Sequence, residues 1–114
     1  MVRTVAALLA APILGAALLA TAALAADPVE IALTIEKHTF SPTEIRVKAG
    51  APFVLVITNK DSTAEEFESK QLRVEKVIPG DKTVRLRMPG LKAGTYPFVG
   101  EFHEATAKGK IIAE

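Results

Sequence analysis

The amino-acid sequence predicts an all-β protein, a Greek-key β-sandwich of about seven strands that follows an N-terminal export signal. Three observations support this prediction. Short runs of alternating apolar and polar residues recur along the chain, as expected for half-buried strands. Turn-forming residues such as Pro79-Gly80 and Pro89-Gly90 separate the runs. Cysteine is absent, so an apolar core must hold the fold without disulfides.

The N-terminal segment has the pattern of a secretory signal peptide. Arg3 precedes an uncharged, Ala- and Leu-rich stretch over residues 5–24, and residues 23–25 form an A-x-A cleavage signal. We therefore expect cleavage after Ala25, export to the periplasm and one mature domain over residues 26–114. A retained membrane anchor is the alternative, because about 20 apolar residues suffice to span a bilayer. No second stretch of this kind follows, so the mature protein is not expected to span a membrane.

Composition excludes several functions. The chain has 14 Lys and Arg against 13 Asp and Glu, and loss of Arg3 with the signal balances the two, so nucleic-acid binding is not expected. A hydrolase has little support, because the sequence has two histidines, no H-E-x-x-H motif, no nucleophile elbow and no Gly-rich phosphate loop.

The expected strands follow the alternating runs. Residues 53–58 form a continuous apolar run, typical of a central strand. Pro97 interrupts a strand pattern and indicates an edge or a bulge. A helical turn is expected at residues 64–72, where Glu, Lys, Gln and Leu concentrate. The remaining strands are expected at 31–36, 45–48, 74–78, 84–88, 96–99 and 111–112, and core aromatic residues at Phe40, Phe53, Phe67, Tyr96 and Phe98.

Two segments carry a resemblance to a known family. Residues 38–61 read HTFSPTEIRVKAGAPFVLVITNKD, and residues 94–114 read GTYPFVGEFHEATAKGKIIAE. The first resembles the opening of cupredoxins, and the second resembles their last strands and ligand loop. The resemblance covers nearly all of residues 29–114 and implies the cupredoxin-like sandwich.

The resemblance also locates the four ligand positions of a blue-copper site. The first histidine position falls on Glu65, the cysteine position on Gly100, the second histidine on His103 and the methionine on Ala107. One ligand of four is kept. Because blue copper requires a thiolate and two imidazoles, this chain cannot form that site.

Carboxylates surround the one ligand that is kept. We expect a metal site of Glu65, Glu66, Glu68, Glu101 and His103 where the two loops of a cupredoxin meet. Such donors suit Fe(II), Fe(III), Mn(II) or Cu(II), and not Cu(I), which prefers sulfur. An extended loop would place Glu101 and His103 on one side and turn Phe102 into the core. From the pattern alone, the acidic run is also typical of a solvated surface. His38 is not at a family ligand position, and a separate peripheral site that includes it is an alternative.

The same residues resemble a narrower group, the small periplasmic cupredoxin-domain proteins of bacterial ferrous-iron uptake systems. This resemblance implies copper or iron as cofactor and an iron-uptake permease, or another periplasmic or membrane component, as partner. It also implies help with metal uptake, or slow Fe(II) oxidation if copper is bound. The alternative from another class is a metal-free interaction module that docks onto a membrane partner through its acidic loops.

Overall fold

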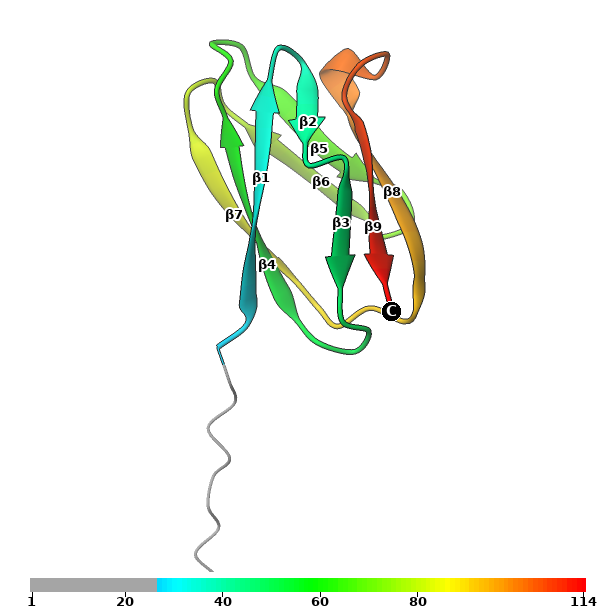
Figure 1. Cartoon of the computed structure of the whole chain (residues 1–114). Coiled ribbons are helices and arrows are strands. Elements are labelled where there is room, and N and C mark those ends of the chain that lie inside the picture. The colour runs from blue at the N-terminus through cyan, green and yellow to red at the C-terminus, as the bar shows by residue number, and fades with distance from the viewer. Residues whose placement is uncertain (1–26) are drawn as a thin grey trace, which may run out of the picture.

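The computed structural model describes residues 27–114 and contains two packed β-sheets, as Figure 1 shows. The first sheet has the strand order β2-β1-β4-β7 and the second β3-β9-β8-β5-β6. Each sheet is mixed, because β1 runs parallel to β4 and β3 runs parallel to β9, whereas the other pairs are antiparallel. The elements are β1 (Val29–Glu36), β2 (Thr39–Ser41), β3 (Glu44–Val47), β4 (Phe53–Asn59), β5 (Glu65–Ser69), β6 (Val74–Ile78), β7 (Thr83–Met88), β8 (Gly94–Gly100), the 3-10 helix η1 (Glu101–His103) and β9 (Lys108–Ala113).

The predicted all-β sandwich is confirmed, with nine strands among residues 27–114 in place of about seven. The additional strands are β2 and β5, and β5 lies where a helical turn was expected. That expectation is wrong because the side chains of residues 65–69 alternate between the interior and the surface, as in a strand. Glutamate favours helices only weakly, and the tertiary position of Phe67 in the core overrides this preference. The predicted signal peptide lies outside the described residues.

The core forms between the two sheets from the inward-facing positions of their strands. Phe40, Phe53, Phe67 and Phe98 are all buried, as predicted, and Tyr96 packs against them while partly exposed. The rings of Phe40 and Phe98 meet edge to face with centroids 5.0 Å apart. The central strand β4 lies between β1 and β7 and buries most of its residues, as the apolar run predicted.

Pro97 does not lie on an edge strand, because β8 is flanked by β9 and β5. The pairing between β5 and β8 covers only Phe67 with Gly100 and Glu68 with Val99. Pro97 therefore lies beyond the end of this ladder, where no partner requires its missing N–H. Its carbonyl accepts a hydrogen bond from the hydroxyl of Ser69 at 2.9 Å.

Three connections gather at one end of the sandwich. The β1–β2 turn and η1 lie at the end opposite the C-terminus, and the β4–β5 loop joins them there (Figure 1). This is the end at which residues from distant parts of the sequence meet. Among residues 27–114, no helix has the length and apolar character needed to cross a membrane.

Candidate metal centre

Glu65 is a buried carboxylate at the first position of β5. Strand alternation turns it inward with Phe67, and its side chain is only 2% exposed. Oε1 accepts hydrogen bonds from the backbone N–H groups of Glu66 and Phe102, both at 3.0 Å. Oε2 accepts a hydrogen bond from Nδ1 of His103 at 2.5 Å. These three donors satisfy a charge that would otherwise be costly to bury.

His103 reaches Glu65 because the chain tightens after β8. Residues 101–103 form η1, and the carbonyl of His103 then accepts hydrogen bonds from the N–H groups of Thr106 and Ala107 at 3.1 and 2.8 Å. The extended loop expected here is therefore wrong. The helical turn separates the two predicted neighbours, since His103 faces Glu65 while Glu101 is exposed, and Phe102 does not enter the core but is 51% exposed.

His38 lies directly over His103, which the spacing along the chain did not predict. The two imidazole rings stack with centroids 3.6 Å apart and an interplanar angle of 15°. Lys37 and His38 form the two-residue β1–β2 turn with φ values of 52° and 56°, the signs required for a type I′ turn. Glycine or asparagine is the common choice for such positions, so the sequence carried no turn signal here.

Asp61 holds this turn from the β4–β5 loop. Its carboxylate accepts hydrogen bonds from the N–H groups of Lys37 at 2.8 Å and His38 at 3.0 Å, and Oδ2 lies 3.5 Å from Nδ1 of His38. The hydrogen bonds from the His38 and Lys37 amides hold the pKa of Asp61 below its ordinary value of 3.8, against the opposing effect of burial. Thr106 adds a tether, since its hydroxyl donates to the carbonyl of His38 at 2.5 Å.

His38, Glu65 and His103 thus form one cluster. Each offers a ligand atom, and the three atoms lie within 4.8 Å of one another. We call this group the imidazole–carboxylate cluster. The side chains of His38 and His103 are 44% and 29% exposed, so the cluster opens to solvent on the histidine side and is closed on the glutamate side.

The structure places the other predicted ligands elsewhere. Because side chains alternate along β5, Glu66 and Glu68 face away from Glu65. Glu66 and Glu101 lie with Glu75 in a second, exposed group whose carboxylate oxygens are within 4.8 Å of one another. Hydrogen bonding to the Glu66 carboxyl and repulsion from its charge raise the pKa of Glu101 above 4.5.

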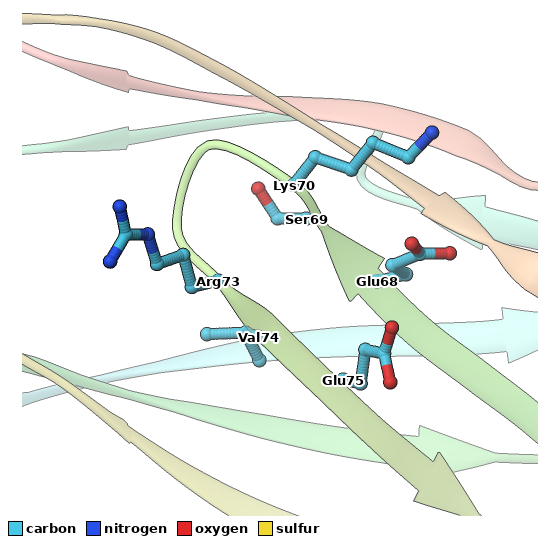
Figure 2. Close-up of a pocket in the computed structure, with 6 residues that line it drawn as sticks. All are labelled: Glu68, Ser69, Lys70, Arg73, Val74 and Glu75. Carbon is cyan, nitrogen blue, oxygen red and sulfur yellow. The ribbon is translucent and has the colours of Figure 1, made fainter.

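Glu68 lies beside that second group. It is paired directly with Glu75 across β5 and β6, and Figure 2 shows the two carboxylates side by side. Partial burial makes the largest contribution to the raised pKa of Glu68, and repulsion from Glu101 and Glu75 raises it further. The open pocket at this hairpin is lined by Glu68, Ser69, Lys70, Arg73, Val74 and Glu75 and includes no member of the imidazole–carboxylate cluster (Figure 2).

Gly100, at the position that the resemblance assigns to the copper thiolate, lies against the Glu65 carboxylate. A Cβ atom at Gly100 would lie 2.7 Å from Cδ of Glu65 and 2.6 Å from Cβ of Ala107. Contacts this short do not occur between real side chains, so a cysteine does not fit here while Glu65 keeps its position. The buried carboxylate has taken the space beside this backbone position.

Solved structures show where this fold is found. Auracyanin A, a blue copper protein from Chloroflexus aurantiacus, superposes with a TM-score of 0.66 at 17% identity, covering 76% of this chain and 99% of that one. Amicyanin from Paracoccus versutus gives a TM-score of 0.59 at 22% identity over 78% and 83% of the two chains. The metal-binding domain of the Cu(I)-exporting P-type ATPase of Streptococcus pneumoniae gives 0.63 at 17% identity over 75% and 84%. At these identities the similarity establishes the fold.

Sequence comparison adds a relative and a family. An uncharacterized protein of Rickettsia prowazekii, RP394, is 39% identical over 83 residues, which make up 73% of this chain. The chain spans 66% of that relative's length, slightly less than two thirds. The profile of the family described as "Cupredoxin-like domain" matches residues 7–113. This chain therefore belongs to the cupredoxin-like domain family.

Proposed function

We propose that the protein binds a copper or iron ion through Glu65 and His103 and handles that ion in the periplasm. The observation that carries this proposal is the buried Glu65 carboxylate, which directs one oxygen at an imidazole nitrogen 2.5 Å away. The resemblance to cupredoxins assigns both residues to positions that carry copper ligands in that family. The carboxylate is only 2% exposed and is held by three donors, so the fold presents its oxygen in a fixed position for an ion.

The donor set suits an ion of intermediate hardness. Imidazole binds Zn, Cu and Fe, and carboxylate extends the range toward Mn, whereas Cu(I) prefers sulfur ligands. Two ligand atoms that share an ion at bonds of about 2.0–2.2 Å lie roughly 3 Å apart or more. The 2.5 Å separation of Oε2 and Nδ1 would therefore have to widen by about half an ångström.

Glu65 and His103 would each provide one ligand atom of such a site. The N–H groups of Glu66 and Phe102 hold Oε1, which leaves Oε2 to face the ion. His103 shares a proton with Oε2, and an ion that takes both atoms as ligands displaces that proton. Binding should therefore release a proton to the buffer. A bound copper or iron ion would supply one-electron redox chemistry.

Sequence features support the proposed location and partner of the protein. The signal-like segment over residues 1–25 supports export to the periplasm. The resemblance to the cupredoxin-domain proteins of ferrous-iron uptake systems supports a role in metal uptake, with a permease or another periplasmic component as partner. Slow Fe(II) oxidation by a copper-loaded form is the enzymatic variant of this role.

Metal titration with a matched control tests the proposal. Wild type, Glu65→Gln, His103→Ala and Glu68→Gln are titrated with Cu(II), Fe(II), Mn(II) and Zn(II) by calorimetry, with Fe(II) handled without oxygen. We expect one ion per chain in wild type and Glu68→Gln, with at least about tenfold weaker binding in the other two variants. Equal binding by all four proteins, or none by wild type, would refute the site.

A metal-free docking function is the second candidate, favoured by one surface. Glu66, Glu68, Glu75 and Glu101 lie close together on β5, β6 and η1, and the exposed Phe102 follows directly. Aromatic residues are enriched at the cores of protein interfaces, whereas carboxylates are typical of their rims. A flat response to every metal, together with a salt-sensitive complex lost on Phe102→Ala, would favour this function.

A further inference from the structure

We infer that His38 is a third protein ligand of the ion, so that the site has two imidazoles and one carboxylate. This inference rests on the proposed function and concerns the composition of the same site. Neither the family ligand positions nor the spacing along the chain assigns His38 a role. The structure brings a ligand atom of His38 within 4.8 Å of those of both Glu65 and His103.

The turn that carries His38 is held in an unfavourable conformation. Lys37 and His38 both have positive φ, at 52° and 56°, and each left-handed residue other than glycine costs roughly 1–2 kcal/mol. A turn selected for stability alone would use Asn-Gly or a similar pair. Histidine is one of the few residues other than glycine that is enriched at positive φ, so the turn can present an imidazole at this position.

Contacts from two other connections hold the turn over His103. Asp61 binds both backbone amides of the turn from the β4–β5 loop, and Thr106 binds the carbonyl of His38 from the β8–β9 connection. The turn is thus anchored to the same connection that carries His103. This arrangement fixes the backbone of His38, whose ring is 44% exposed and contacts Asp61 Oδ2 through Nδ1 at 3.5 Å.

The stacked rings must open for both to bind one ion. A metal lies near the plane of each imidazole that binds it, and two planes 15° apart do not converge on one nearby point. His38 is the more exposed of the two rings and its contact with Asp61 is long, at 3.5 Å, whereas Glu65 holds His103 at 2.5 Å. We therefore assign the movement to His38.

The resulting donor set defines the class of ion. Two histidines and one carboxylate with open positions are the ligands of mononuclear non-haem Fe(II) sites, and His₂Glu is also a catalytic zinc set. Among divalent first-row ions, such a site should bind Cu(II) most tightly, and its affinities for Fe(II) and Zn(II) should both be lower. Mg(II) and Ca(II), which prefer all-oxygen sites, should not compete.

The test counts the imidazoles bound to Cu(II) by pulsed electron paramagnetic resonance. Wild-type protein is compared with His38→Asn, because asparagine tolerates positive φ and should keep the turn folded. Thr39→Val is the control, since it removes only the hydrogen bond from Thr39 to the Glu36 carbonyl in the same hairpin. We expect two imidazoles in wild type and Thr39→Val, and one in His38→Asn, with at least about tenfold weaker binding.

The outcomes separate this inference from the proposed function. If wild type binds no copper, both the proposed function and this inference are refuted. If wild type binds one copper through a single imidazole, and His38→Asn binds equally well, the metal function stands and the role of His38 is refuted. The loss of one imidazole signal in His38→Asn alone supports the inference, and circular dichroism confirms that each variant is folded.

Discussion

Replacing Glu65 with alanine should destabilise the protein even when no metal is present. The substitution leaves the N–H groups of Glu66 and Phe102 without their acceptor and removes the partner of His103. Each hydrogen bond to a charged group contributes about 1.5–3 kcal/mol. Against this loss stands the cost of burying a carboxylate, which is several kcal/mol. We therefore expect a net loss of about 2–4 kcal/mol.

Chemical unfolding in urea with a chelator measures this effect. For a domain of this size, a loss of about 2–4 kcal/mol lowers the melting temperature by roughly 10–30 °C. Glu68→Ala is the matched control on the same strand, because Glu68 points to the opposite face, where partial burial and repulsion from Glu101 and Glu75 raise its pKa. Its effect should stay within about 0.5 kcal/mol. An equally small effect of Glu65→Ala would refute the reasoning that Glu65 is satisfied by the fold.

Three further predictions concern neighbouring groups. Gly100→Ala should cost about 1–3 kcal/mol in urea unfolding, because the new Cβ would lie 2.7 Å from Cδ of Glu65; wild-type stability would contradict the packing described here. Asp61→Ala should lower the free energy of unfolding by about 0.5–2 kcal/mol, as loss of a helix cap does, because two turn amides lose their acceptor. Since the pKa of Asp61 is lowered, this difference should fade as the pH falls below about 3.8. A difference that does not change with pH would contradict this prediction. The raised pKa of Glu101 means that the folded protein holds a proton that the unfolded chain releases near 4.5, so stability falls as the pH rises from there through the raised value. Glu101→Gln should thus gain stability over wild type as the pH rises above about 4.5, and a constant difference would show that Glu66 does not repel Glu101.

Local patterns predicted the fold well because the strands are short and amphipathic. The apolar run at residues 53–58 is central strand β4, and Phe98 is buried where alternation placed it. The prediction was wrong at β5, where the acidic residues obscured the alternation of Glu65, Phe67 and Ser69. Sheet order and the parallel pairing of β1 with β4 depend on distant contacts, which no local pattern encodes.

The candidate site was predicted only in part for the same reason. The resemblance identified Glu65 and His103, which the structure brings together. Strand alternation at Glu66 and the helical turn at Glu101 then moved two expected neighbours to a separate surface group. His38 was missed because its approach to His103 spans 65 positions of the chain and depends on a turn without a sequence signal.

The contact between Gly100 and Glu65 also constrains how this site and a thiolate–copper site can interconvert during evolution. A cysteine introduced at Gly100 collides with the Glu65 carboxylate as well as with Ala107, and a histidine introduced at Glu65 removes the acceptor for two backbone amides. Each substitution is therefore harmful when it occurs alone. If the two substitutions together restore function, the pair shows sign epistasis. A lineage that exchanges one site for the other must pass through a destabilised intermediate. The glycine and the glutamate should accordingly be inherited as a pair.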